Sequence, residues 1–220
     1  AIVSVPDFNG TSVRTLLVGN DGGVFQAADA YTVSRNSGWT TLNHNLGVTE
    51  FYGAAGNATS GTIVGGTQDN GTLRYTPAAG PQGWTAMHGG DGGFCAADPT
   101  DPNYFYGEYV YLQIHRSING GASSSYITAG LGDAGIANGL DPDDPEAESS
   151  ANFIAPFILD PNNPNTLLAG GSNLWRSVNV KAASPTWSNI KPGGNGSFIS
   201  AIAVAPGNSD VIWVGHNNGD

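Results

Sequence analysis

The sequence predicts an all-β fold built from repeated four-stranded antiparallel sheets. Short apolar runs alternate with clusters of Gly, Asn and Asp, and 33 of the 220 residues are glycine. Such clusters form tight turns between antiparallel strands, because these residues adopt positive φ at little cost. No stretch of ten residues combines apolar positions at helical spacing with capping signals at both ends. Strands joined by tight turns therefore account for almost the whole chain.

The segment 62–94 shows the repeating unit most clearly. Apolar runs at 62–64, 72–75 and 84–87 are predicted strands, and Gly-Thr-Gln-Asp-Asn-Gly separates the first two. A second turn is Gly-Gly-Asp-Gly-Gly, so two glycine-containing turns of the segment each carry a carboxylate, Asp69 and Asp91. The position of these two turns decides the functional interpretation below.

The same pattern recurs along the chain as an apolar run that ends in glycine. The glycines that end these runs are Gly19, Gly65, Gly107, Gly170 and Gly215. Their spacings are 46, 42, 63 and 45 residues, and a unit of four strands in roughly 40–45 residues has the size of a β-propeller blade. We predict a single β-propeller region over 1–220, with about 4.5 blades present. The predicted blades are 1–47, 48–90, 91–150 and 151–197, followed by a half-blade at 198–220.

An incomplete propeller leaves a strand edge unpaired, which is costly and promotes association. Two explanations remain open for the half-blade at 198–220. The chain is a fragment whose remaining blades belong to a longer protein, or copies of it associate as a homo-oligomer.

The order of the runs resembles the BNR/Asp-box family of β-propellers, which includes sialidases, sortilin-type domains and xyloglucanase-type glycoside hydrolases. The family motif is Ser-x-Asp-x-Gly-x-x-Trp. Altered copies lie at Ser34-Arg35-Asn36-Ser37-Gly38-Trp39, at Ser117-Ile118-Asn119-Gly120-Gly121, and at Ser177-Val178-Asn179 with Trp187. Asn replaces Asp in all three. Arg116 and Arg176 share one repeated Arg-Ser position, which indicates a structural role and argues against a sialidase arginine triad.

Composition narrows the classes of partner. The net charge is −11, from 18 acidic and 7 basic residues, so we expect no binding to nucleic acid. No run of 18 apolar residues occurs, so the chain is not expected to span a membrane. The low charge and the many Gly, Ser, Thr and Asn residues favour an exported protein, secreted to the outside or to a periplasm.

Strand alternation predicts where the candidate site lies. The turn between the second and third strands of a blade shares one end of the sheet with the link to the next blade. We call this end the rim. Carboxylates with nearby aromatic rings suit sugars, whose apolar faces stack on aromatics while their hydroxyls need acceptors. The predicted ligand-binding residues of the rim are Glu50, Phe51, Tyr52, Asp69, His88, Phe94, Glu108 and Tyr109.

Glycoside hydrolysis needs two carboxyl groups across a cleft. The turns Asn20-Asp21-Gly22-Gly23 and Gly90-Asp91-Gly92-Gly93 are similar to the Asp-x-Gly-Gly turns of xyloglucanase-type enzymes. The resemblance implies that Asp21 is the base and Asp91 the acid. The structural alternative is that each aspartate serves the geometry of its own turn.

We therefore expect a glycan-directed propeller, either carbohydrate-binding or hydrolytic through Asp21 and Asp91. The alternative is a non-catalytic scaffold for protein partners, which self-associates through the incomplete blade. No cofactor or metal is expected, since no histidine or cysteine spacing fits a metal site. The acidic insert 139–150 has two interpretations, a solvated loop or a Ca²⁺ site.

Overall fold

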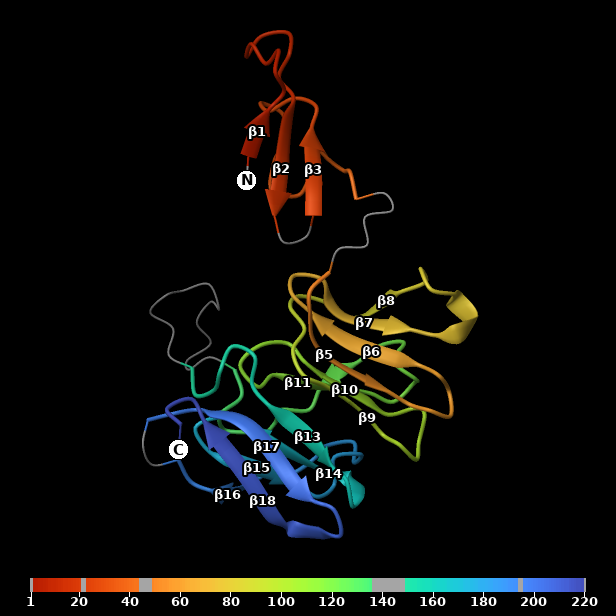
Figure 1. The fold of residues 1–220 in the computed structure, drawn as a ribbon, viewed down its shortest axis with the longest axis vertical. Coiled ribbons are helices and arrows are strands. Elements are labelled where there is room, and N and C mark those ends of the chain that lie inside the picture. Colours follow the sequence, from red (N-terminus) through yellow and green to blue (C-terminus); the bar gives the residue numbers. More distant parts are fainter. Residues whose placement is uncertain (1, 21–22, 44–48, 136–148, 194–195, 220) are drawn as a thin grey trace. The chain divides into compact units, whose positions relative to one another are not determined.

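The computed structural model describes residues 2–20, 23–43, 49–135, 149–193 and 196–219. The chain divides into two compact units, 1–50 and 51–220 (Figure 1). Each unit is described by itself below. The assignment of 1–220 to a single propeller region stays a prediction.

Unit 1–50 is one antiparallel sheet with the strands in sequence order. Its strands are β1 (Ile2–Ser4), β2 (Leu16–Asn20), β3 (Gly23–Ala27) and β4 (Trp39–Thr41). In the register of the two central strands, Val18 lies opposite Phe25. An ion pair between Arg14 and Asp29 joins the segments on either side of these strands.

Unit 51–220 contains three four-stranded sheets and one two-stranded sheet, all antiparallel and in sequence order. The first sheet contains β5 (Phe51–Gly56), β6 (Ile63–Thr67), β7 (Gly71–Tyr75) and β8 (Thr85–His88). The second contains β9 (Cys95–Ala97), β10 (Phe105–Glu108), β11 (Ile114–Ser117) and β12 (Ser125–Tyr126). The third contains β13 (Phe157–Asp160), β14 (Asn163–Gly170), β15 (Leu174–Ser177) and β16 (Ser188–Lys191). The fourth contains β17 (Ile199–Ala205) and β18 (Asn208–His216).

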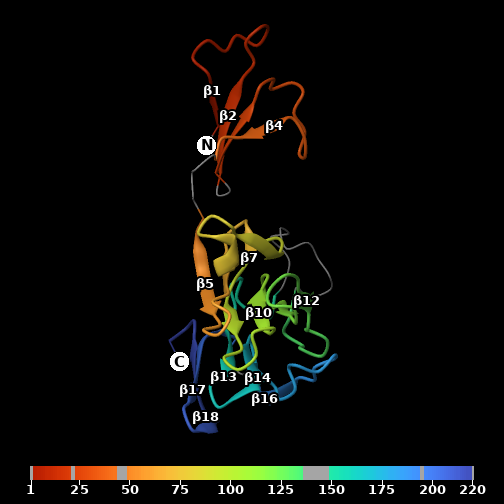
Figure 2. The same cartoon turned by 90° about the vertical axis from the view of Figure 1, so that its right-hand side faces the viewer.

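The first strands of successive sheets are neighbours in space. β9 contacts both β5 and β13, and β13 contacts β17, so the sheets follow one another around a common side (Figures 1 and 2). Within the described residues the only helical element is the short 3₁₀ turn Pro77–Ala79. The predicted fold class is confirmed: four-stranded antiparallel sheets repeat along the chain, and the last sheet has two strands.

Each apolar cluster of unit 51–220 fills the space between two consecutive sheets. Val64, Met87 and Phe105 pack between the first and second sheets. Larger clusters pack between the second and third sheets and between the third and fourth sheets. Burying these side chains contributes about 1.5–3 kcal/mol for each large one. The repeat therefore stabilises the unit through contacts between neighbours, as in other repeat architectures.

Arginines of the repeated Arg-Ser position also join neighbouring sheets. Arg116 on β11 donates from Nη1 to the carbonyl oxygen of Ala182, which follows β15 in the next sheet, at 2.7 Å. Arg176 on β15 pairs with Asp210 on β18, at 3.4 Å. The structural role that the sequence indicates for this position agrees with both contacts.

Glycines allow the link between β8 and β9 to lie directly on the first sheet. A Cβ atom on Gly66 would lie 2.0 Å from the carbonyl oxygen of Gly93, and one on Gly92 would lie 2.6 Å from that of Gly71. Backbone hydrogen bonds hold the same contact, including one from Gly92 N–H to Thr67 O at 2.8 Å. Side chains at these glycines would separate the link from the sheet.

We predict that Gly66→Ala destabilises the protein strongly, because the new methyl group must displace backbone atoms rather than a flexible side chain. A loss of about 3 kcal/mol or more in the free energy of unfolding is expected, as for other overpacked core positions. Urea unfolding followed by tryptophan fluorescence measures it. The control is Gly89→Ala, since a Cβ atom there meets nothing within 4 Å. Equal stability of the two variants would contradict the prediction.

Candidate functional site

In the first sheet, the turn between the second and third strands and the link to the next sheet lie at the same end, as predicted for the rim. The turn between β6 and β7 contains Asp69, and the link between β8 and β9 contains Asp91. The backbone N–H of Asp69 donates to Oδ1 of Asp91 at 2.9 Å. Asp69 needs this support because its φ is +60°, in the left-handed region that disfavours side chains. One oxygen of Asp91 is thus fixed, and Oδ2 accepts no hydrogen bond from the residues that the structure describes.

Two tyrosines flank this pair of acids. The ring of Tyr109 lies against Gly90, where a Cβ atom would come within 2.5 Å of it. Glycine at position 90 therefore allows an aromatic ring beside the Asp91 turn. Tyr52 contacts the turn that carries Asp69 and donates from its hydroxyl to Oε1 of Gln68 at 3.2 Å. Carboxylates and phenol rings thus lie together at the rim of the first and second sheets.

A further aromatic pair belongs to the rim of the second sheet. The rings of Tyr111 and Phe153 meet edge to face, with centroids 5.4 Å apart. The backbone N–H of Tyr111 donates to the carbonyl oxygen of Phe153 at 3.0 Å. Both Tyr111 and Leu112 have positive φ, +51° and +61°, which marks the turn as strained. Phe153 was not among the predicted residues, because no local pattern places the link near this turn.

Glu108 lies beneath this surface rather than on it. Its side chain is fully buried, and Oε1 accepts backbone N–H groups from Ala155 at 2.8 Å and Leu112 at 3.0 Å. Oε2 accepts a longer bond from the N–H of Phe94 at 3.4 Å. Burial raises the pKa of Glu108 to about 8, although the three donors lower it. The predicted direct contact with a ligand is therefore replaced by a positioning role that joins three segments.

His88 lies between two sheets rather than at the rim. Its ring stacks on that of His115, with centroids 4.0 Å apart and planes inclined by 11°. Nδ1 and Nε2 of His88 lie 3.0 Å from the hydroxyl groups of Ser124 and Tyr126, respectively. Burial lowers the pKa of both histidines, and the neighbouring ring lowers that of His115 further. The pair, with His115 buried and His88 half-buried, joins β8 to β11.

The remaining predicted residues have different surroundings. Asp21 lies outside the described residues, and Glu50 belongs to unit 1–50, so neither is placed against Asp91. Phe51 projects over Gly65 on a face of the first sheet, and its ring lies 5.7 Å from that of Trp84. Phe94 is half-buried and packs against the cluster between the second and third sheets. Asp69, Asp91, Tyr52 and Tyr109 are thus the predicted residues that the structure brings together.

The sequence analysis did not identify a second acidic corner. Asp133, in the link between β12 and β13, accepts the backbone N–H of Asn173 at Oδ2, 2.7 Å away. The Asn173 amide donates to the same carboxylate at 2.8 Å. Asn173 lies in the turn between β14 and β15, so Asp133 holds the turn of the sheet that follows its link, whereas Asp91 holds the turn of the sheet that precedes its link. The shared position of turn and link was the available signal, and Asp133 lies in an irregular segment that obscured it.

No candidate cation site is present among the described residues, in which no three His, Cys, Asp or Glu side chains cluster suitably. Most of the acidic insert 139–150, including Asp141, Asp143, Asp144, Glu146 and Glu148, lies outside the described residues. Ca²⁺ binding there stays a prediction. Within the described residues, no helix is long and apolar enough to cross a membrane.

Comparison with known proteins supports the fold. No protein-family model matches the sequence, and no curated protein sequence matches it. Among solved structures, an ancestral GH74 enzyme matches 98% of this chain with a TM-score of 0.55 and 16% identity. The GH74 xyloglucanase from Xanthomonas campestris also matches 98% of it, with a TM-score of 0.48 and 16% identity.

The match concerns part of those larger proteins. The chain spans 27% of the ancestral enzyme and 33% of the xyloglucanase. The likeness to the ancestral enzyme, at 16% identity, shows a propeller fold and leaves activity to the site itself. The all-β architecture and the repeated sheets place the chain among β-propeller proteins. The BNR/Asp-box resemblance stays a prediction.

We predict that Glu108 makes stability fall as pH rises. The folded pKa of about 8 exceeds the ordinary value of 4.5, so the folded state retains the proton longer. This contribution is complete below pH 4.5 and is lost as pH rises through 8, by up to about 1.4 kcal/mol per pH unit. Unfolding free energies of wild type and Glu108→Gln across pH 5–9 measure it. Their difference should shrink with rising pH, and a constant difference would contradict the prediction.

The stacked pair of His88 and His115 predicts that the free energy of unfolding falls as the pH drops below 6.5. Because the folded pKa of His115 lies well below the ordinary 6.5, the unfolded chain takes up protons first as pH falls. Stability is therefore present above pH 6.5 and is lost below it. Chemical denaturation of wild type and His115→Gln between pH 7.5 and 5 tests this. The variant should lose less stability over that interval, and parallel losses would refute the assignment.

Proposed function

We propose that the rim of unit 51–220 binds glycan chains and that the protein is an exported, glycan-directed propeller. The observation that carries this proposal is the corner formed by Asp69, Asp91 and Tyr109. It combines carboxylate acceptors with an aromatic ring at one end of adjacent sheets. Sugar rings stack on aromatic faces and donate hydroxyl hydrogens to fixed acceptors, so this combination suits a saccharide.

The corner is preorganised for binding. Asp91 Oδ1 is fixed by the Asp69 N–H, which aims the carboxylate and leaves Oδ2 available as an acceptor. Gly90 keeps the Tyr109 ring adjacent. Because these groups are held before a ligand arrives, little conformational entropy is lost on binding. The GH74 enzymes that share the fold support a glycan as the ligand class.

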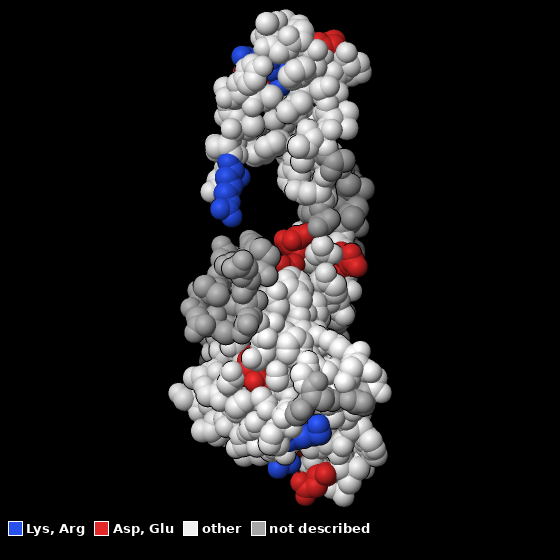
Figure 3. Space-filling model, turned by 90° about the vertical axis from the view of Figure 1, so that its left-hand side faces the viewer, with Lys and Arg blue, Asp and Glu red and all other residues white. Residues whose placement is uncertain are grey.

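Charged side chains are sparse on the surface shown in Figure 3, where basic groups form no continuous patch. The sequence carries 18 acidic and 7 basic residues. Both observations favour a neutral saccharide over nucleic acid as the partner of the rim. Aromatic stacking and hydroxyl hydrogen bonds, rather than ion pairs, are therefore proposed to supply the affinity.

Hydrolysis is the finer form of the proposal, with Asp91 as the acid and Asp21 as the base. It requires that the two carboxyl groups lie about 5–10 Å apart across an open cleft. A non-catalytic scaffold is the second candidate. The bond from Asp69 N–H to Asp91 favours it, because a carboxylate that supports a turn has a structural reason to be present.

Binding of β-glucan oligosaccharides to the full chain, measured by calorimetry, tests the glycan proposal. We expect Tyr109→Leu to weaken binding about tenfold through loss of stacking. Trp213→Leu is the matched control, because Trp213 is an exposed aromatic residue on β18, where it is 59% exposed. Equal effects of the two substitutions, or no binding by wild type, would overturn the proposal.

Release of reducing sugar separates an enzyme from a binding module. A hydrolase loses this release in Asp91→Asn, while binding of the oligosaccharide persists because the amide oxygen still supports the turn. Binding without any release by wild type assigns the protein to the non-catalytic class. Retained release in Asp91→Asn would remove Asp91 from the mechanism.

A further inference from the structure

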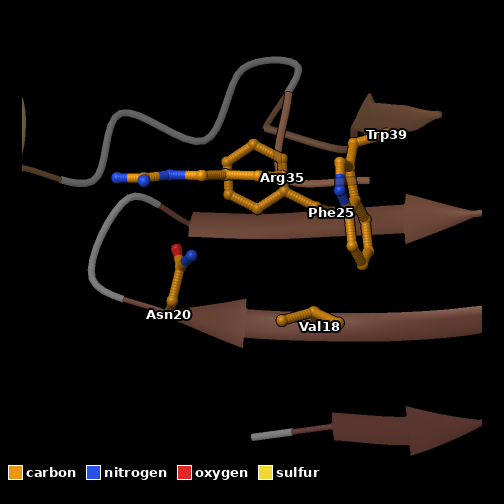
Figure 4. Close-up of a pocket in the computed structure, with 5 residues that line it drawn as sticks. All are labelled: Val18, Asn20, Phe25, Arg35 and Trp39. Atoms are coloured by element: carbon orange, nitrogen blue, oxygen red, sulfur yellow. The ribbon is translucent and has the colours of Figure 1, made fainter. Parts of the chain in front are cut away.

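Unit 1–50 carries a pocket on one face of its own sheet. In the register of the strands, Val18 pairs with Phe25, Asn20 with Gly23, and Ala27 with Trp39. Side chains of directly paired residues point to the same face, and the face alternates along each strand. Val18, Asn20, Phe25 and Trp39 therefore share one face, and they line a cavity of about 260 Å³ together with Arg35 (Figure 4).

The altered Asp-box motif supplies two walls of this pocket. The N–H of Ser34 donates to the carbonyl oxygen of Ser37 at 3.0 Å, which closes a short turn around Arg35. Gly38 ends the turn at φ +85°, where a side chain would be strained. The indole N–H of Trp39 then donates to Ser34 O at 2.9 Å. Trp39 is thereby fixed with its polar atom occupied, so that only its ring surface is available to a ligand.

Arg35 provides the charge. Its guanidinium makes no hydrogen bond or ion pair with any residue that the structure describes, whereas Arg14 in the same unit pairs with Asp29. Figure 4 shows the guanidinium and Asn20 at one end of the pocket, with the Phe25 and Trp39 rings farther along. A guanidinium that no described residue engages, beside aromatic rings, is an arrangement that recognises a planar carboxylate attached to an apolar face.

We propose that this pocket binds a uronic acid residue, the carboxylate-bearing unit of an acidic glycan. The carboxylate pairs with the Arg35 guanidinium, and the apolar face of the sugar ring stacks on Trp39 and Phe25. The amide of Asn20 hydrogen-bonds to a ring hydroxyl. A neutral sugar would satisfy the rings and leave the guanidinium unpaired, so the pocket discriminates by charge.

Size and net charge restrict the ligand further. The volume of about 260 Å³ is at the small end of ligand pockets and suits one sugar residue rather than a chain segment. The protein carries a net charge of −11, which repels a polymer with many carboxylates. The best ligand is therefore a single uronic acid on an otherwise neutral saccharide.

This site is independent of the proposed function. It lies on the face of the sheet β1–β4, and none of its residues belongs to the rim of 51–220. If neutral glycans do not bind at the rim, the proposal for this pocket still stands. If no uronic acid binds in the pocket, the proposal for the rim still stands.

The test uses the full chain and two probes in calorimetry. One is a disaccharide of glucuronic acid linked to glucose, and the other has glucose in place of the glucuronic acid. We expect Arg35→Gln to weaken binding of the acidic probe about tenfold, as loss of a charged hydrogen-bonded pair does. Binding of the neutral probe should be unchanged. Arg35→Lys should recover part of the affinity, because the charge remains while the two-pronged geometry is lost.

Arg14→Gln is the control, since its guanidinium is already engaged by Asp29. Thermal unfolding of each variant confirms that it folds. Equal affinity for the two probes, or equal losses in Arg35→Gln and Arg14→Gln, would overturn the proposal. Self-association that depends on Arg35, without preference for the acidic probe, would show that another copy of the chain occupies the pocket. That result would also overturn it.

Discussion

The buried Glu108 carboxyl group is the interaction on which the rim of unit 51–220 depends. It receives backbone N–H groups from Phe94, Leu112 and Ala155, which belong to the start of the second sheet, its central turn and the approach to the third. None of these segments has a helix or a long ladder to fix it. Together with backbone bonds such as that from Tyr111 N–H to Phe153 O, this side chain joins the three loops. Its neutral form is favoured by burial, and the shared acceptor Oε1 satisfies two donors that would otherwise be unpaired.

Glycine has a complementary role, because it lets those loops approach the sheet. The carbonyl oxygen of Gly93 occupies the space that a side chain of Gly66 would need. The Gly-Gly-Asp-Gly-Gly segment therefore reflects packing of backbone on backbone, with one aspartate at its tip. Asp91 can serve both as a turn residue and as a functional carboxylate, because its two oxygen atoms can have different roles. Oδ1 supports the turn, and Oδ2 remains for a ligand.

The sequence predicted the strands and their order well because turn residues mark the end of each strand directly. It also predicted that Asp69 and Asp91 share an end of the sheet, since antiparallel reversal requires this. It could not predict how deeply an individual side chain is buried. Glu108 and His88 follow the same local pattern as surface positions, yet Glu108 is fully buried and His88 stacks on a residue of another sheet. Such contacts depend on how consecutive sheets pack. The contact of Phe153 with Tyr111 was missed for a similar reason, because no local sequence pattern predicts the path of the link that carries Phe153.

The two acidic corners differ in direction, and this difference determines which sheets each contact joins. Asp91 reaches back to the turn of the sheet that precedes it, whereas Asp133 reaches forward to the turn of the sheet that follows. The first contact stiffens one sheet internally, and the second couples two sheets mechanically. The position of one aspartate along a link thus determines whether it bonds the preceding sheet or the following one. A repeat architecture can in this way vary the contacts between its sheets at their ends without altering the apolar clusters between them.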